Sequence, residues 1–383
     1  MRHYLGAELS DADMSERVPA SMQASARFDP LDTRHSLQRR GFRPWQVMRY
    51  VYRPFDVRWV YWEPTTKLLD EKRSEYMEQT IVPGPCLVAQ QKSRGDSSPP
   101  QFISRVGCLD LFDRGASCFP ASLVHVAGTL LREVRVCNNL SVAAAEKVLE
   151  IGGDERHLLF HALAIMHAPQ YRFNNRGALL SDWPRVALPS TADLLSRSAA
   201  LGRRLAELLD AESAAEFGTE WKFLGALRLP RDSDLNESLQ ITADWGRRGQ
   251  GSTVMPAPGR SVTRLWTEEE RRKITRLAAA LSITPVDALA LLGNNCVDVY
   301  LNGDAMWSTV PVNVWDYTLG GYQVLKKWLS YREFDLLGRA LRADEAAYFA
   351  QVVRRITAIL LMGPELDASY QSILPTAVGL SAS

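Results

Sequence analysis

The chain has 383 residues, of which 46% are hydrophobic and 23% charged, and this composition excludes disordered, collagen-like and coiled-coil proteins. Its 45 Lys and Arg residues and 44 Asp and Glu residues leave a net charge of +1. No whole-chain field therefore holds a polyanion, and any contact with nucleic acid must come from a local patch.

The first part of the chain is predicted to be a leader followed by a sheet. Residues 1–44 are polar and contain Pro19 and Pro30, so we expect a flexible leader with one short helix at most. Aromatic and β-branched runs then occupy residues 58–62, 86–91 and 101–106, separated by Gly, Pro and Ser. Such runs are typical of strands, so a sheet is predicted here.

The middle of the chain is predicted to be helical. An apolar helix that begins near residue 154 must end at Pro169, because proline clashes with the preceding turn. Capping residues place three more helix starts, at Ser190, Thr267 and Thr284, and Gly293 can end the last of these helices.

Two histidines on the first of these helices have the spacing of metal ligands. His157 and His161 lie four residues apart and therefore on one face. No third ligand with a suitable spacing follows, so a solvated or core-satisfied pair is favoured over a metal site.

The last third of the chain combines a loop, a hairpin and two helices. Residues 229–262 are rich in Gly, Pro and Arg, which predicts a long loop or a linker. Asn302-Gly303 lies between two strand-like runs and predicts a tight hairpin. Residues 320–333 and 343–362 have the apolar spacing of amphipathic helices.

Sequence motifs of several enzyme classes are missing. The chain has no GxxxxGK[ST], GxGxxG or HExxH motif, which disfavours ATP hydrolysis, dinucleotide binding and zinc peptidase chemistry. Ser98-Pro99-Pro100-Gln101 is similar to the [DNS]PP[YFW] loop of amino-methyltransferases, but Gln101 has no ring to stack on a flipped base. A polar turn between two strands is favoured, and we expect no catalytic residue.

Cysteine usage and hydropathy indicate a cytoplasmic protein. The cysteines are odd in number and form no CxxC pair, which argues against a disulfide framework or a thiolate zinc site, and no metal or other cofactor is expected. The amino terminus carries acids where a signal peptide needs an apolar core, and no apolar run approaches about 18 residues. No membrane association is expected. The five cysteines are Cys86, Cys108, Cys118, Cys137 and Cys296.

Three segments together resemble a known family. Residues 52–62 read YRPFDVRWVYW, residues 165–172 read IMHAPQYR and are followed by SDWPRVALP, and residues 310–333 follow the predicted hairpin. In this order and spacing they resemble the C-terminal specificity domain of Type ISP restriction-modification enzymes, over roughly residues 45–363. The positions that carry the resemblance most clearly are Arg53, Asp56, Arg58, Trp59, Gly320, Gly321 and Tyr322.

The resemblance implies a DNA-recognition role in phage defence without catalysis. In that family one long polypeptide carries a nuclease, a translocase, an adenine methyltransferase and finally the target-recognition region. We therefore expect this chain to bind double-stranded DNA and to give specificity to a methyltransferase or translocase on another polypeptide. Two alternatives remain: the C-terminal subunit of a split N6-adenine DNA methyltransferase that is active only with its partner, and a truncated remnant.

Two polar loops contain the candidates for reading bases. Gln and Asn can grip adenine and Arg can grip guanine in the major groove, and both loops follow a predicted apolar element. For any single member, a solvated polar side chain is the favoured alternative. The candidates are Gln90, Gln91, Lys92 and Arg94 in the first loop and Arg172, Asn174, Asn175 and Arg176 in the second.

Two further sites are candidates for phosphate contacts. Lys326 and Lys327 lie early in a predicted helix whose diglycine start would leave free N–H groups for a phosphate. The arginines around Asp56 can face the phosphate backbone, but a structural ion pair between Asp56 and Arg53 or Arg58 is favoured.

The predicted fold class is α+β. We expect a sheet-containing recognition lobe followed by a helix-rich lobe that includes the β-hairpin. The predicted divisions are a flexible leader at 1–44, the recognition lobe at 45–190, the helix-rich lobe at 191–363 and a frayed tail at 364–383.

Overall fold

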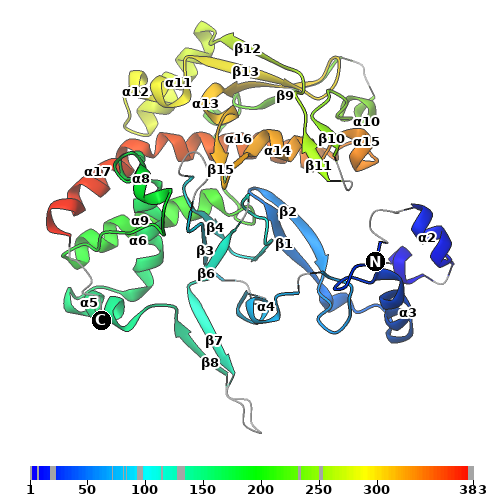
Figure 1. The fold of residues 1–383 in the computed structure, drawn as a ribbon. Helices are drawn as coiled ribbons and strands as arrows, with labels where there is room; N and C mark the ends of the chain where they lie inside the picture. Colours follow the sequence, from blue (N-terminus) through cyan, green and yellow to red (C-terminus); the bar gives the residue numbers. More distant parts are fainter. Residues whose placement is uncertain are drawn as a thin grey trace.

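The computed structural model describes residues 2–6, 8–17, 23–70, 72–80, 82, 84–92, 98–113, 115–126, 134–231, 234–249 and 253–377. The fold is mixed α+β, as predicted, and its strands form several small sheets (Figure 1). Within the described residues, one cluster of buried hydrophobic side chains extends from Val51 to Ile373, so segments on both sides of residue 190 contribute to it. The boundary between two lobes stays a prediction.

The leader contains more helix than predicted. Its described residues form α1 (Arg2–Leu5), α2 (Asp11–Arg17) and α3 (Pro30–Arg40). Asp29 starts α3 because its carboxylate accepts a hydrogen bond from the Asp32 N–H. Leu37 is fully buried in a small cluster with Tyr4, and the buried Arg34 donates to the Tyr4 carbonyl oxygen. The prediction of one short helix at most is therefore wrong.

The predicted sheet region is confirmed as strands in three separate sheets. Their orders are β2-β1-β5, β4-β3-β6 and β7-β8. Ser98, Pro99 and Pro100 lie between β3 and β4, as the predicted turn requires. The bounds are β1 (Val47–Arg53), β2 (Asp56–Tyr61), α4 (Ser74–Thr80), β3 (Cys86–Ala89), β4 (Gln101–Ile103), β5 (Val106–Gly107), β6 (Ser117–Pro120), β7 (Ser122–Val126) and β8 (Val134–Asn138).

A group of helices follows the sheets. These are α5 (Val142–Glu150), η3 (Glu155–His157), α6 (Leu158–His167), α7 (Pro169–Asn174), α8 (Arg176–Leu179) and α9 (Ala192–Leu209). Helix α6 ends before Pro169, as predicted, and Pro169 begins α7. The cap of α9 is Thr191 rather than Ser190, because the Thr191 hydroxyl accepts the Leu194 N–H.

A four-stranded antiparallel sheet has the order β12-β13-β14-β9. Its strands are β9 (Ala226–Arg228), β12 (Ser261–Leu265), β13 (Asn295–Tyr300) and β14 (Met306–Pro311), accompanied by α11 (Glu268–Ala280), α12 (Pro285–Leu292) and α13 (Val312–Trp315). The predicted helix starts at Thr267 and Thr284 are confirmed. The hairpin at Asn302 is also confirmed, but its connection is longer than a two-residue turn, because Leu301 N–H donates to the Ala305 carbonyl oxygen.

The segment predicted as a long loop or linker is packed. It contains α10 (Leu235–Ser238) and the hairpin of β10 (Gly246–Arg248) and β11 (Val254–Pro256). Trp245 is fully buried, and its indole N–H donates to the Tyr300 carbonyl oxygen at 2.7 Å. The backbone N–H of Trp245 donates to the Glu333 carboxylate. The prediction is wrong because long-range contacts fix this segment.

The diglycine segment does not begin a helix. Gly320 and Gly321 form the turn between β15 (Thr318–Leu319) and β16 (Tyr322–Gln323), with φ angles of 58° and 84°. Helix α14 (Val324–Ser330) begins only after Gln323. The prediction of a phosphate at a diglycine helix start is therefore wrong.

The carboxyl-terminal helices belong to the core. They are α15 (Phe334–Leu337), α16 (Ala343–Leu361), α17 (Gly363–Ile373) and η6 (Leu374–Thr376). Because α17 buries Leu366, Tyr370 and Ile373, the prediction of a frayed tail is wrong for residues 364–376. Residues 343–376 have the length and hydropathy of a membrane span, but 67% of the 18-residue window is buried, as in a core helix. Helix α16 runs between the four-stranded sheet and α9 (Figure 1).

Candidate functional site

The two predicted base-reading loops meet in the fold. Gln90 follows β3 and Arg172 lies on α7, yet both line one small cavity together with Pro100. Gln91 extends the contact, because its side-chain N–H lies 3.5 Å from a carboxylate oxygen of Asp182. The cavity measures about 20 Å³ and holds one water molecule at most. It is too small for a ligand, and the residues that line it show that the two loops pack against each other. Arg94 lies outside the described residues.

The members of the two loops differ in whether their polar groups are bonded within the protein or exposed at the surface. Gln90 is half-buried and donates to the Asp113 carbonyl oxygen, and Asn175 is half-buried and donates to the Tyr171 carbonyl oxygen. These bonds indicate structural roles. The exposed members are Gln91, Lys92, Asn174 and Arg176.

An exposed aromatic residue between these candidates was missed by the sequence reasoning. Phe173 on α7 is 80% exposed and follows Arg172 directly. Trp183 is also partly exposed and packs edge-on against Phe119 at 5.4 Å between ring centroids. Aromatic residues beside Arg and Asn are typical of nucleic-acid contacts. The available signal was an aromatic residue inside the polar run 171–176.

Of the two histidines with metal-ligand spacing, His161 is a core residue and His157 is half-buried. His161 is fully buried, with one ring nitrogen bonded to the Ser198 hydroxyl and the other to the Ala187 carbonyl oxygen, both at 2.9 Å. Burial lowers the pKa of His161 to about 4. For His161, this confirms the core-satisfied interpretation. No group of three His, Cys, Asp or Glu side chains within the described part of the chain could hold a metal ion.

Asp56 holds two arginines at the start of β2. Its carboxylate is 1% exposed and accepts from Arg58 and Arg332, each at 2.8 Å. Burial alone would raise the pKa of Asp56, but Arg332 and Arg58 together lower it below its ordinary value. The predicted ion pair is confirmed for Arg58. Arg53 instead donates to the Tyr52 carbonyl oxygen.

Three cations and three tyrosines alternate in a ring next to the Asp56–Arg58 ion pair. The Arg53 guanidinium lies 4.2 Å from the Tyr52 ring centroid and 5.4 Å from that of Tyr322. Arg58 lies 4.1 Å from Tyr52 and 4.6 Å from Tyr331. The Lys327 ammonium completes the ring, since it lies 5.2 Å from the Tyr322 ring centroid and 4.9 Å from that of Tyr331. We call these side chains the cation–tyrosine ring: Tyr52, Arg53, Arg58, Tyr322, Lys327 and Tyr331.

The ring unites residues that the sequence singled out separately. Arg53 and Arg58 belong to the first segment of the resemblance, and Tyr322 and Lys327 belong to the last. Lys326 is half-buried on the same helix, outside the ring. Sequence reasoning missed Tyr52 and Tyr331 as participants, because the ring forms only when Tyr331 meets Arg58, and these two residues are far apart in the sequence.

The opposite face of the β1–β2 hairpin carries an exposed tryptophan. Trp59 is 63% exposed, pairs across the strands with Arg49 and lies 5.2 Å from its guanidinium. Both line a cavity of about 330 Å³ with Arg105, and both arginines contact Glu212. Glu212 thus offsets one of the two guanidinium charges on this face.

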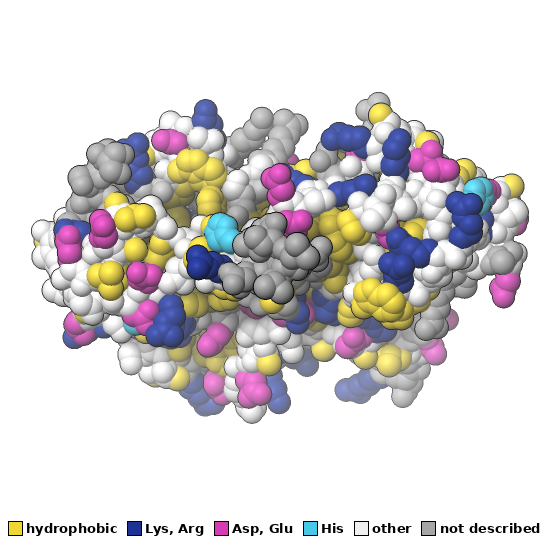
Figure 2. Space-filling model, turned by 90° about the horizontal axis from the view of Figure 1, so that it is seen from below, with side chains coloured by type: hydrophobic (Ala, Val, Ile, Leu, Met, Phe, Trp, Pro, Cys, Tyr) yellow, Lys and Arg dark blue, Asp and Glu magenta, His cyan; other side chains and the backbone are white. Residues whose placement is uncertain are grey.

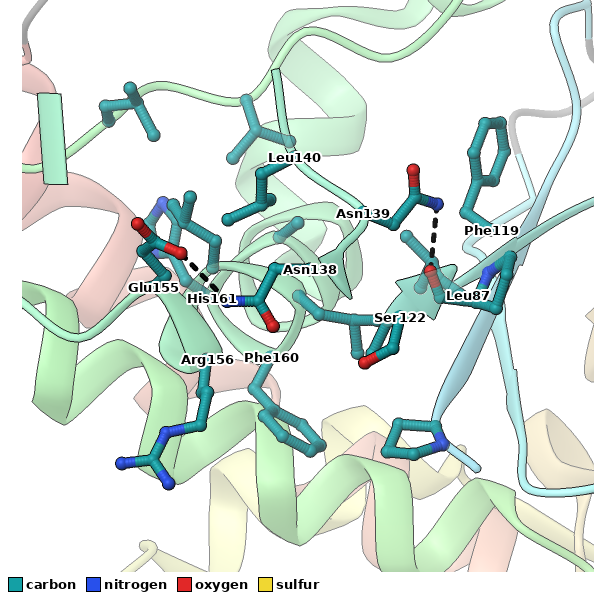
Figure 3. A pocket seen from close by; sticks show the side chains of 18 residues that line it. Leu87, Phe119, Ser122, Asn138, Asn139, Leu140, Glu155, Arg156, Phe160 and His161 are labelled. Atoms are coloured by element: carbon teal, nitrogen blue, oxygen red, sulfur yellow. Dashed lines mark hydrogen bonds between the residues drawn. The ribbon is translucent and has the colours of Figure 1, made fainter. Parts of the chain in front are cut away.

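A larger apolar cavity lies between β6 and α6. It measures about 580 Å³, and Leu87, Leu140 and Phe160 are among the side chains that line it (Figure 3). At its rim Asn138 donates to Glu155, as the dashed line in Figure 3 shows. The polar rim is therefore engaged within the protein and offers no evident reactive group.

Charge on the surface is mixed. On the face seen in Figure 2, Lys and Arg side chains are interspersed with Asp and Glu rather than gathered in one stripe. This distribution agrees with the net charge of +1 and restricts any anion binding to local clusters.

Comparisons with known proteins identify the fold and the family. Two similar solved structures are "ATP-dependent Type ISP restriction-modification enzyme LlaBIII bound to DNA" (TM-score 0.55, 12% identity) and "cryoEM structure DrdV-DNA complex" (TM-score 0.55, 17% identity). Each similarity covers 96% of this chain but only 21% and 33%, respectively, of those chains. No curated protein matches by sequence. Residues 10–352 match the family described as the Type ISP C-terminal specificity domain, and because this match covers most of the chain, the chain belongs to that family.

Proposed function

We propose that this chain binds a short sequence of double-stranded DNA and gives specificity to an adenine methyltransferase or translocase on another polypeptide. Its family is the specificity part of Type ISP enzymes, and the two similar structures are described as DNA complexes. The observation that carries the proposal is the convergence of the two predicted base-reading loops at Gln90 and Arg172.

Recognition uses the exposed amides and cations around this junction. A Gln or Asn side chain can bond to N6 and N7 of adenine, and Arg can bond to O6 and N7 of guanine. Gln91, Asn174 and Arg176 are exposed and supply these groups. Lysines and further arginines contact phosphates and fix the register on the duplex without reading sequence.

Selection from a pool of randomised duplexes at moderate salt tests the proposal, with and without the methyltransferase or translocase polypeptide. We expect one enriched motif. Gln91→Ala should relax one position of that motif and weaken binding to the selected site by about 1–3 kcal/mol. Arg197→Ala is the matched control, since Arg197 is exposed on α9 and pairs with Asp193 away from the junction. Recovery of no motif in either condition would contradict DNA recognition.

A further inference from the structure

We infer that the cation–tyrosine ring binds a backbone phosphate of the DNA duplex. The inference rests on the proposed function and assigns one contact within it. Strands β1 and β2 supply Tyr52, Arg53 and Arg58, while the segment from β16 to the residue after α14 supplies Tyr322, Lys327 and Tyr331.

The ring and its surroundings hold more positive than negative charge. Asp56 is shared by Arg58 and Arg332, so one carboxylate serves two guanidinium groups. No carboxylate among the described residues forms an ion pair with Arg53 or Lys327. Four cations, Arg53, Arg58, Lys327 and Arg332, outnumber the nearby carboxylates, which are Asp56, Asp110 and Asp113, so a local excess of positive charge remains.

Burial makes this excess of charge costly without an anion. Arg53 is 9% exposed, and its buried Nε has no hydrogen-bond partner. The tyrosine faces offset part of the repulsion, because the negative face of an aromatic ring attracts a cation. They supply no full negative charge, however, and a buried cation normally requires one. A bound anion would supply it.

The geometry suits a phosphate in particular. Guanidinium groups offer forked N–H donors that match phosphate oxygens, and the ammonium adds a compact point charge. The Arg58 side chain is 36% exposed and Lys327 is half-buried, so the ring reaches the surface. Lys327 stays a phosphate candidate, and its neighbours in the ring, rather than a helix start, now provide the reason.

Lys327 gives the site a pH signature. Burial, followed by the nearby Arg53, lowers the pKa of Lys327 to about 8. An anion in the ring favours the ammonium form, so binding takes up a proton near this pH and weakens as the pH rises above it. The charged or titratable groups that face Lys327 are Arg53 and Tyr52 on β1, Arg58 on β2, Tyr322 on β16, Tyr331 after α14, and Asp113 between β5 and β6.

Titrations of the selected duplex at several salt concentrations, at pH 7 and pH 9, test the inference. The wild-type protein should lose about tenfold in affinity between these pH values, as expected for a free pKa near 8. Lys327→Arg should bind without this loss, because arginine stays charged. Lys327→Gln should bind about five- to tenfold more weakly at pH 7 and about 0.1 M salt, with a salt slope smaller by about 0.9.

Lys273→Gln is the matched control. Lys273 also lies over an aromatic ring, that of Phe223 at 5.7 Å, but it pairs with Glu269 on α11. This variant should keep the wild-type salt slope and pH dependence. If Lys327→Gln fails to fold, the comparison of wild-type protein with Lys327→Arg still tests the site.

The outcomes separate this inference from the proposed function. Motif-selective binding with an unchanged salt slope in Lys327→Gln and no pH difference between wild-type protein and Lys327→Arg would overturn the phosphate site alone. If no duplex binds, the proposed function is wrong, and a DNA backbone phosphate cannot be the anion that the ring binds. Pyrophosphate is then the probe: thermal stabilisation that is lost in Lys327→Gln would support a site for a free phosphate compound, and no stabilisation would overturn the site entirely.

Discussion

A buried neutral histidine ties the segment before β4 to helix α6. His167 is 4% exposed, and its Nε2–H donates to the Pro100 carbonyl oxygen at 2.8 Å. Burial lowers the pKa of His167 to about 3, against about 6.5 in an unfolded chain. Between these values the unfolded state binds more protons than the folded state. The free energy of unfolding therefore rises with pH across this window, and the contribution of neutral His167 is complete above it.

This histidine gives a testable pH dependence. His167→Gln keeps a donor for Pro100 but removes the titration. Between pH 5 and 6, we expect its free energy of unfolding to depend on pH less steeply than the wild-type value, by about 1 kcal/mol per pH unit. Urea unfolding at pH 5, 6 and 7 measures the slope, with the exposed His125→Gln as control. An unchanged slope in His167→Gln would show that folding does not lower the pKa of His167 and would contradict the buried neutral form.

Gly202 sets the distance between α6 and α9. A Cβ atom added there would lie 1.8 Å from the Phe160 carbonyl oxygen, so the two helices would have to separate. We expect Gly202→Ala to lower the free energy of unfolding by about 3 kcal/mol or more. Gly177→Ala is the control, because no atom lies within 4 Å of its added Cβ, and it should stabilise α8 by up to about 1 kcal/mol. Equal urea midpoints for the two variants would contradict this packing argument.

At the scale of elements, short-range signals could be predicted from sequence. The Thr267 hydroxyl and the Glu270 carboxylate cap α11 from within one turn. Pro169 ends α6 through its own ring, and Thr284 with Pro285 starts α12. In each case the residues that decide the boundary are neighbours in the chain, so their pattern carries the information.

Elements that depend on distant partners could not be predicted in this way. Trp245 makes residues 229–262 part of the core, yet its hydrogen-bond partners Tyr300 and Glu333 lie 55 and 88 residues away. The Gly, Pro and Arg content of this segment describes only its local chain preferences. The same limit explains the tail, where burial of Tyr370 beside Tyr171 stabilises α17.

Asp56 connects β2 to Arg332, which lies two residues after the end of α14. Asp56→Asn would leave Arg58 and Arg332 without their shared anion, at a site where the carboxylate is 1% exposed. Removing one partner of a buried ion pair typically costs about 3–5 kcal/mol. We expect a loss of this size in urea unfolding. Asp154→Asn is the control, since its partner Arg156 is 81% exposed, and it should shift the urea midpoint far less than Asp56→Asn. Comparable losses in both variants would contradict the role of Asp56.

At the scale of the whole molecule, the parts of the candidate site could be predicted from the sequence, but their meeting in space could not. Each base-reading loop was predictable as a polar run after an apolar element. Their meeting at Gln90 and Arg172 was not, because it depends on how β3 and α7 pack. The cation–tyrosine ring has the same origin, since its two halves lie about 270 residues apart and no periodicity relates them.

Contacts across the predicted lobe boundary indicate that the molecule unfolds as one unit. The buried Gln101 side chain donates to the Leu209 carbonyl oxygen at 2.9 Å, and the Tyr348 hydroxyl donates to the Phe55 carbonyl oxygen at 3.0 Å. Together with the continuous core, these bonds make separate unfolding of residues 45–190 costly, since it would expose apolar surface and break buried hydrogen bonds.

We therefore expect tryptophan fluorescence and far-ultraviolet circular dichroism to report one urea transition with the same midpoint. Trp59 and Trp62 on one side of residue 190, and Trp245 and Trp307 on the other, make the fluorescence sensitive to both parts. Gln101→Ala should move the single midpoint to lower urea without dividing it, because it removes two hydrogen bonds, to the Phe102 and Leu209 carbonyl oxygens, and leaves the continuous core in place. Two resolved transitions in the wild-type protein would show that the shared core does not couple the two parts.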